Sequence, residues 1–232
     1  MTAVPELHLA MIRRVAESLG ELRDEVVFTG GVVTCLLLTD QAAGGIRATD
    51  DVDLIAGIES HRAYYKFAER LRSHGFVEDP DGPICRWRVR GTIVDVMPTA
   101  EEVLGFSNRW YAEAIREAQA VVLDGGINVR VVTPPFFLAT KLEAFYGRGH
   151  GDFVTSHDME DIIALVDGRP EIVGDVRSVS NPDLRGCLRD EFSKLLASDA
   201  FIACIPGHLP PSDRGQARGN AVFARLNAIA NG

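Results

Sequence analysis

Segments with the pattern of β-strands are confined to the first 132 residues of this 232-residue chain. They are short apolar stretches bounded by glycine, proline or polar turns: "EVVFTGG", "DVDLIAG", "ICRWRV", "TIVDVMP" and "AVVLDGGINVRVV". From Thr133 onward no strand pattern remains, and the sequence is typical of helices separated by short loops. We therefore predict an α/β fold, with a small mixed sheet and flanking helices over residues 1–132 and an α-helical part over residues 133–232.

Turn residues predict how the strands are connected. Arg90-Gly91 joins two of the strands as a hairpin, and Asp124-Gly125-Gly126 forms the turn of a second hairpin. Ser60 has the residue type and position of a helix N-cap. The helices expected in the first part are residues 5–19, a helix that begins at Gly30-Gly31, residues 60–75 and residues 108–118.

Composition excludes several classes of protein. No apolar run is long enough to cross a membrane, and the N-terminus lacks the apolar core of a signal peptide, so we expect a cytoplasmic protein without a membrane partner. The four cysteines are scattered without a CxxC spacing, which argues against zinc binding and redox chemistry. A net charge of −9 argues against non-specific coating of nucleic acid, and we expect no DNA partner, although a cationic small molecule would suit such a surface.

Acidic residues in two predicted strands indicate a metal site. Side chains alternate along a strand, so Asp51 and Asp53 point to one face. Asp50 is the alternative first acid, but it falls on the other face, which favours Asp51. Two carboxylates on one face repel each other unless a cation lies between them, and Mg²⁺ prefers such oxygen ligands. Asp95 stands among apolar residues of its strand with no other evident partner, which makes it the best third acid for a two-metal site.

A glycine pair upstream of these acids indicates phosphate binding. A helix that begins at Gly30-Gly31 would offer free backbone N–H groups and the positive end of its dipole, with no side chain in the way. A glycine pair alone is usually a turn, and a lone DxD is usually a solvated strand end. Their occurrence in this order, followed by Asp95, favours a site that holds phosphates and metal ions together.

The stretch "TGG…ATDDVDL…IVDV" resembles the hG[GS]…DhD…hhD pattern of the polymerase-β-like nucleotidyltransferase superfamily. The resemblance implies that the glycines hold the triphosphate of an NTP and that the acids bind two Mg²⁺ ions. Many members have Ser where Gly31 stands, so a hydroxyl contact to phosphate would have to come from elsewhere, such as Thr34. The roles implied are phosphate binding for Gly30 and Gly31, metal binding for Asp51 and Asp53, and metal binding with activation of the attacking hydroxyl for Asp95.

The stretch "KLEAFYGRGHGDFVTSHDMEDIIALV" resembles the second half of the AbiEii-like nucleotidyltransferase toxins of type IV toxin–antitoxin systems. In those proteins a KL…R element and a later RxKDxxD element complete the active site. Thr155 and His157 replace the Arg and Lys of the second element. The resemblance covers residues 26–167, and the matching residues are Lys141 and Arg148 in the first element and Asp158 and Asp161 in the second.

The same residues have simpler interpretations. Lys141 on a mostly apolar helix could extend to water instead of binding phosphate. Asp158 could serve only to compensate a helix dipole. The three arginines of "RWRVR" share one face of a strand that leads toward Asp95, where they could form a solvated edge or guide the phosphates of an NTP or RNA.

These observations predict an Mg²⁺-dependent nucleotidyltransferase that moves an NMP from an NTP to an acceptor hydroxyl, with its active site in a cleft between the two parts. The resemblance to the toxins implies an RNA acceptor, such as a tRNA 3′ end, and an antitoxin protein partner. The alternatives are a small-molecule nucleotidyltransferase of the aminoglycoside type and an inactive binding module of the same fold. The expected catalytic residues are Asp51, Asp53, Asp95, Lys141 and Asp158, and the expected nucleotide-binding residues are Gly30, Gly31, Thr34, Lys141, Arg148 and Asp161.

Overall fold

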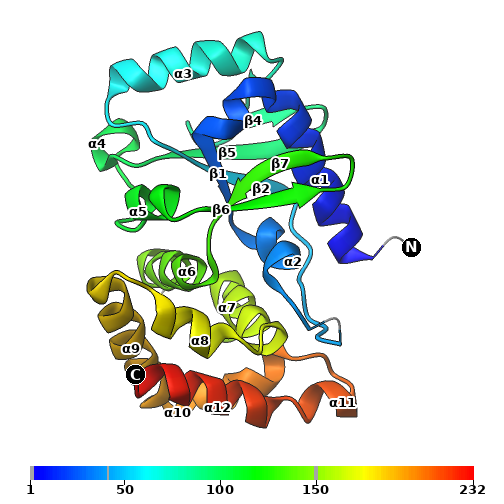
Figure 1. Cartoon of the computed structure of the whole chain (residues 1–232), viewed down its shortest axis with the longest axis vertical. Helices are drawn as coiled ribbons and strands as arrows, with labels where there is room; N and C mark the ends of the chain where they lie inside the picture. Colours follow the sequence, from blue (N-terminus) through cyan, green and yellow to red (C-terminus); the bar gives the residue numbers. More distant parts are fainter. Residues whose placement is uncertain (1–2, 41, 149–150) are drawn as a thin grey trace. The chain divides into compact units, whose positions relative to one another are not determined.

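The computed structural model describes residues 3–40, 42–148 and 151–232 (Figure 1). The chain divides into two compact units. The first unit consists of Met1–Cys35 and Ala48–Thr133, and the second consists of Leu36–Arg47 and Pro134–Gly232. The predicted fold class is confirmed: a mixed sheet with flanking helices forms the first unit, and helices form the second. The inclusion of Leu36–Arg47 in the second unit has no signal in the sequence pattern.

In the described part of the chain, the first unit contains a seven-stranded sheet with the order β3-β4-β5-β2-β1-β7-β6. The β2–β5 and β1–β7 pairs are parallel, and the other neighbours are antiparallel. Both predicted hairpins, β4–β5 and β6–β7, are confirmed. The strands are β1 (Val26–Thr29), β2 (Asp51–Ala56), β3 (Val77–Glu78), β4 (Arg86–Val89), β5 (Thr92–Pro98), β6 (Gln119–Leu123) and β7 (Ile127–Val131).

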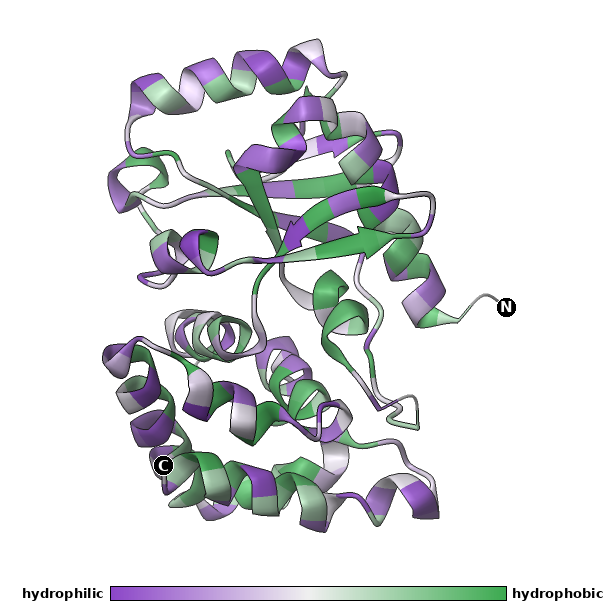
Figure 2. Ribbon diagram, viewed as in Figure 1, coloured by the Kyte–Doolittle hydropathy of each residue, from purple (hydrophilic) through white to green (hydrophobic). Residues whose placement is uncertain are grey.

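Amphipathic helices bury one face each in the first unit. In α1 (Val4–Leu19) the buried apolar residues recur at helical spacing, as predicted. The helix α3 (His61–Ser73) begins after Ser60, whose hydroxyl accepts a hydrogen bond from the N–H of Ala63, as expected of an N-cap. Both helices alternate between hydrophilic and hydrophobic residues along their length (Figure 2). Two short helices, α4 (Glu101–Leu104) and α5 (Tyr111–Arg116), complete this unit.

The helix expected to begin at the glycine pair is present, and it is short. Gly31–Val33 forms a single 3₁₀ turn, and α2 (Thr34–Leu37) adds only four residues. Gly30 precedes the turn with φ of +76°, a left-handed conformation that favours glycine. The chain therefore makes a tight bend after β1 and enters a short helical segment whose first turn is 3₁₀.

The second unit is built on two central helices, α6 and α7, against which α9 and α12 pack. No helix in the described ranges is long and apolar enough to span a membrane. The helices are α6 (Pro134–Arg148), α7 (His157–Gly168), α8 (Ile172–Ser178), α9 (Pro182–Leu196), α10 (Asp199–Cys204), α11 (Asp213–Gln216) and α12 (Gly219–Ala230).

Backbone hydrogen bonds attach Leu36–Arg47 to the end of α7. The N–H groups of Thr39 and Asp40 donate to the carbonyl of Gly168 at 3.0 and 2.9 Å. A Cβ at Gly168 would lie 2.4 Å from Leu38 Cγ, so only glycine permits this close approach. The guanidinium of Arg218 also donates to the Asp40 carboxylate at 2.7 Å. This segment is therefore part of the helical unit, although it lies between two strands in the sequence.

Candidate functional site

The three acids predicted to bind metal lie on neighbouring strands of the first unit. Asp53 on β2 is the direct neighbour of Asp95 on β5 in the parallel register, so the two side chains emerge on the same face of the sheet. Asp51 lies two residues before Asp53 on that face, and its Oδ1 accepts a hydrogen bond from the hydroxyl of Thr49 at 2.6 Å. Asp51 and Asp53 are half-buried, and Asp95 is buried. We call this group, Asp51, Asp53 and Asp95, the acid face.

The glycine bend lies directly against the acid face. A Cβ built on Gly30 would lie 1.8 Å from Oδ2 of Asp53, so any side chain at this position would overlap the carboxylate. Thr29, the residue before the bend, is the antiparallel neighbour of Asp53. The sequence order of glycine pair and acids therefore becomes direct contact in space.

Arg86 binds Asp95 of the acid face, whereas the sequence suggested a solvated edge or a guide for phosphates. Its Nε and Nη2 donate to Oδ1 and Oδ2 of Asp95 at 2.8 and 2.7 Å, and its Nη2 lies 3.9 Å from Asp51 Oδ2. The hydrogen bond to Asp95 raises the pKa of Arg86 above its ordinary value, while desolvation opposes this rise. A Cβ at Gly82 would lie 2.7 Å from Arg86 Cδ, so this turn glycine makes room for the arginine. The expectation that Asp95 has no partner other than a metal ion is therefore wrong.

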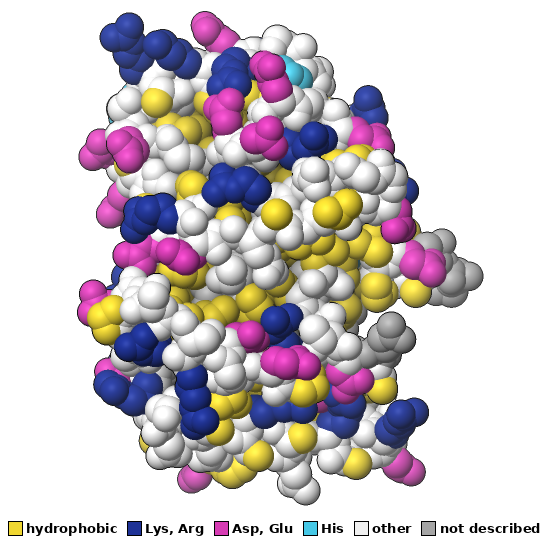
Figure 3. Space-filling model, viewed as in Figure 1, with side chains coloured by type: hydrophobic (Ala, Val, Ile, Leu, Met, Phe, Trp, Pro, Cys, Tyr) yellow, Lys and Arg dark blue, Asp and Glu magenta, His cyan; other side chains and the backbone are white. Residues whose placement is uncertain are grey.

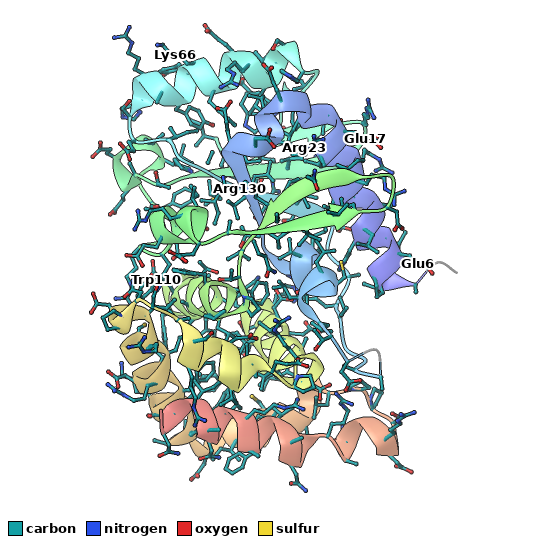
Figure 4. The ribbon with its side chains drawn as sticks, in the orientation of Figure 1. Glu6, Glu17, Arg23, Lys66, Trp110 and Arg130 are labelled. Carbon is teal, nitrogen blue, oxygen red and sulfur yellow. The ribbon has the colours of Figure 1, made fainter. Side chains whose placement is uncertain are left out.

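The other two arginines of "RWRVR" also have carboxylate partners. Arg88 Nη2 lies 2.8 Å from the buried Asp79 carboxylate. Arg90 Nη1 lies 3.3 Å from Glu17, which projects from α1 (Figure 4). Arg88 and Arg90 are both more than half exposed, so their pairs contribute less to stability than that of Arg86.

The acid face has carboxylate oxygens of the kind that bind magnesium, but Arg86 engages those of Asp95. Its carboxylate oxygens are the ligands that hard divalent cations prefer. Within the described residues, however, no group of three or more His, Cys, Asp or Glu side chains is arranged to hold a metal ion. Both carboxylate oxygens of Asp95 are engaged by Arg86. In this arrangement the acid face is therefore not a formed metal site, and the two expected Mg²⁺ ions stay a prediction.

The residues predicted to bind phosphate at the glycine bend are buried. Gly30 and Gly31 are enclosed, and the Thr34 side chain is 1% exposed. Among the described residues, the Thr34 hydroxyl has no hydrogen-bond partner. The N–H of Thr34 donates to the Gly31 carbonyl and is therefore also unavailable to a ligand. A phosphate role for these three residues stays a prediction that requires local opening.

A second cluster of charged residues is buried in the helical unit. Lys141 on α6 places its Nζ 3.2 Å from Asp158 Oδ1 and 2.6 Å from Asp161 Oδ2, both on α7. Asp158 and Asp161 share a helix face because they are three residues apart. Arg47 donates to both oxygens of Asp161, at 3.0 and 3.1 Å. We call these four residues the charged cluster.

The charged cluster contains three residues that the sequence predicted for the site. The fourth, Arg47, was not predicted. Lys141 is 6% exposed and paired with acids, so the interpretation that it extends to water is wrong. Asp158 lies in the first turn of α7, but it is also buried beside the lysine. Arg47 comes from a loop without periodicity, and no pattern in the sequence pointed to it. Arg148 ends α6, and its side chain lies outside the described residues.

The two positions that depart from the toxin pattern have local contacts. The hydroxyl of Thr155 donates to the Asp152 carboxylate at 2.5 Å. His157 is exposed, with its Nδ1 3.4 Å from Glu160. Ser156, between them, caps α7 by accepting a hydrogen bond from the N–H of Met159. These residues start the helix that carries the two aspartates.

The cysteines form no disulfide bond, and burial affects the thiols of two of them. All four are free. Burial raises the pKa of Cys35 to about 12 and that of Cys85 to about 11, so both thiols remain protonated at neutral pH.

Structural comparison finds weak similarity to known proteins. The Helicobacter pylori protein JHP933 aligns with 100% of this chain and 94% of its own, at 12% identity and a TM-score of 0.48. A candidate nucleotidyltransferase from H. pylori aligns with 100% of this chain and 96% of its own, at 11% identity and a TM-score of 0.49. The antibiotic-resistance factor ANT(2'')-Ia, a solution structure, covers 83% of this chain and 96% of its own, at 16% identity and a TM-score of 0.46.

The sequence itself matches no protein-family model and no curated protein. Similarity at these identities and TM-scores does not assign a family or an activity to the chain. The chemistry must therefore be argued from the acid face and the charged cluster.

Proposed function

We propose that this protein is a nucleotidyltransferase that transfers an NMP from an NTP to an acceptor hydroxyl. The observation that carries the proposal is the register of β2 and β5, which places Asp53 beside Asp95 with Asp51 on the same face and the Gly30 bend in contact. A protein stabilises three neighbouring carboxylates by bringing cations to them. Arg86 brings one positive charge to Asp95 and Asp51, and a bound metal ion would bring more to the acid face.

Asp95 is the residue proposed to take the proton in the reaction. The acceptor hydroxyl forms a bond to the α-phosphorus, the bond to pyrophosphate breaks, and the hydroxyl proton passes to a carboxylate. Arg86 must first release the Asp95 oxygens. Magnesium, when held by the acid face, would offset the negative charge that develops on the phosphate oxygens.

The charged cluster is proposed to contribute to nucleotide binding from the helical unit. Lys141 is held between two carboxylates, and Arg47 neutralises the second of them. This arrangement fixes the ammonium group in one position instead of leaving it on a mobile side chain. The buried pairing fixes Lys141 in place, and the proposal that it contacts phosphate rests on the resemblance to the toxins.

For the acceptor, we propose RNA, such as a tRNA 3′ end, with an antitoxin as the protein partner. This follows from the resemblance of residues 141–166 to the toxin sequences. A cationic small molecule of the aminoglycoside type is the second candidate, because a net charge of −9 favours its approach. An inactive binding module is the third.

A labelling experiment distinguishes these candidates. The wild-type protein is incubated with Mg²⁺, each of the four α-labelled NTPs, and either total bacterial RNA or a panel of aminoglycosides. The test variant is Asp51→Ala/Asp53→Ala. The matched control is Asp50→Ala, which removes an exposed neighbouring carboxylate.

We expect label in tRNA-sized RNA with the wild type and with Asp50→Ala, and none with the double variant. Label in an aminoglycoside instead would move the proposal to the second candidate. Absence of label in every acceptor, or equal labelling by the double variant, would contradict nucleotidyl transfer at the acid face.

A further inference from the structure

A concave pocket of about 500 Å³ lies in the helical unit, and its lining includes no residue of the charged cluster. It is lined by residues of α8, α9 and the end of α12. Three of the lining residues are arginines, Arg177, Arg185 and Arg189, and the apolar ones include Val176 and Ile229. A cavity of several hundred Å³ with apolar walls and a few charged groups is typical of ligand sites. We call it the arginine pocket.

The arginines are held in place without strong neutralisation. Arg177 Nη2 donates to the carbonyl of Ala228 at 3.4 Å, and Arg185 Nη1 donates to the carbonyl of Val179. Within the described residues, neither guanidinium forms an ion pair with a carboxylate. Arg189 pairs with Asp190 at 2.8 Å, but both side chains are more than half exposed. Such an exposed pair contributes little and exchanges readily.

The arginine pocket carries positive charge in a protein that is acidic overall. The chain carries 24 basic and 33 acidic residues, and three of its arginines line one pocket. Backbone carbonyls orient a guanidinium without removing its net charge, so an anion can still bind to its remaining N–H groups. Basic side chains are visible over the helical part in Figure 3. The pocket is therefore prepared for an anionic ligand.

We infer that the arginine pocket binds the phosphate groups of a nucleotide, either free or within an RNA strand. Guanidinium groups bind phosphate oxygens in pairs and also stack on nucleobases. Among the apolar lining residues, Val176 and Ile229 are buried, whereas Pro182 is exposed and offers a surface on which a base can lie. A simple inorganic anion would leave most of a pocket of this size unfilled. The inference does not rest on the proposed transfer reaction, because binding here requires no turnover.

The test measures binding of two probes by fluorescence polarisation, in EDTA and in the Asp51→Ala/Asp53→Ala background. These conditions remove metal-dependent binding at the acid face. The probes are a fluorescein-labelled single-stranded RNA of mixed sequence and a fluorescent ATP analogue. Dissociation constants are measured at several salt concentrations, because phosphate contacts make binding to nucleic acid strongly salt-dependent.

The pocket variant is Arg177→Ala/Arg189→Ala, and it spares Arg185, whose guanidinium supports the loop before α9. The control is Arg62→Ala/Lys66→Ala, which removes the same charge from the exposed side of α3, where Lys66 points outward (Figure 4). Far-UV circular dichroism checks that both variants are folded.

We expect the pocket variant to weaken at least one probe by about tenfold, whereas the control changes it by about twofold or less. For RNA, the logarithm of the association constant decreases as the logarithm of the salt concentration rises, and the slope is negative. The magnitude of this slope should be smaller by about 0.7 for each phosphate group that the variant no longer neutralises. Loss of RNA binding alone identifies a strand as the ligand, and loss of the ATP analogue alone identifies a free nucleotide. If the protein with its three pocket arginines binds neither probe, or if both variants lose affinity equally, the inference is wrong.

Discussion

Removing the positive charge of Lys141 should strongly destabilise the helical unit. The side chains of Lys141, Asp158 and Asp161 are 8%, 5% and 3% exposed, and that of Arg47 is 16% exposed. The cluster holds two cations and two anions, so it is neutral overall. The substitution Lys141→Met keeps most of the side-chain volume but removes the ammonium group that both buried carboxylates contact. Breaking a buried ion pair in this way costs about 3–5 kcal/mol.

Urea denaturation followed by circular dichroism at 222 nm measures this loss. A urea m-value of about 1–3 kcal/mol/M converts it to a fall in the midpoint of about 1–5 M. Trp87 and Trp110 both belong to the first unit, so tryptophan fluorescence provides a separate signal for that unit. The matched control is Lys66→Met on the exposed side of α3, for which we expect a change within about 0.5 kcal/mol.

A double-mutant cycle separates charge imbalance from lost packing. Replacing Asp158 by Asn in the Lys141→Met protein restores neutrality, because Arg47 and Asp161 remain as a pair. We expect the combined loss to be smaller than the sum of the two single losses by about 1–3 kcal/mol. If Lys141→Met costs less than about 1 kcal/mol, or if the two substitutions add, the buried charges do not depend on one another and the reasoning fails.

Two further predictions concern the acid face. Gly30→Ala should lose about 1–2 kcal/mol of unfolding free energy from its positive φ, and more from a Cβ that would fall 1.8 Å from a carboxylate oxygen of β2. Gly75→Ala, with φ of +83° and open space around it, is the control measured by the same urea titration, and equal losses would rule out the contact. Arg86→Met should lower the dissociation constant for Mn²⁺ by about tenfold or more. In the wild type a metal ion must displace the two charge-assisted hydrogen bonds from Arg86 to Asp95, and the variant lacks them. Electron paramagnetic resonance of free Mn²⁺ measures this, with Arg88→Met as control, and unchanged or weaker binding would contradict the role of the arginine.

Local patterns predicted the elements of the fold because each strand and helix depends on its own residues. The absence of strand patterns after Thr133 identified the helical part, and alternation placed Asp51 and Asp53 on one face. The helix at the glycine pair begins where predicted, but its first turn is 3₁₀, because the apolar pattern of "GVVTCLLL" suits a buried 3₁₀ turn as well as an α-helix. Burial in tertiary structure, which a short window does not contain, decided between them.

The pairing of Arg86 with Asp95 was within reach of sequence reasoning. The turn residues Arg90 and Gly91 have φ of +45° and +78°, as in the tight two-residue turns that join antiparallel strands. A two-residue turn fixes the register of the hairpin, and counting back from it pairs position 86 with position 95. The position of Arg47 was not within reach, because its contact with Asp161 spans 114 residues and depends on how a loop packs.

The path of the chain through its two units limits how the protein can be divided. The polypeptide leaves the first unit after Cys35, returns at Ala48 and leaves again after Thr133. A fragment ending at residue 132 would carry the Leu36–Arg47 segment without the Gly168 carbonyl that anchors it, and a fragment starting at residue 133 would lack Arg47 beside Asp161. The first fragment would therefore contain a segment of the other unit, and the second would lack that segment. Exchange of the helical part between related proteins, in the laboratory or during evolution, must therefore transfer two separate stretches of sequence together.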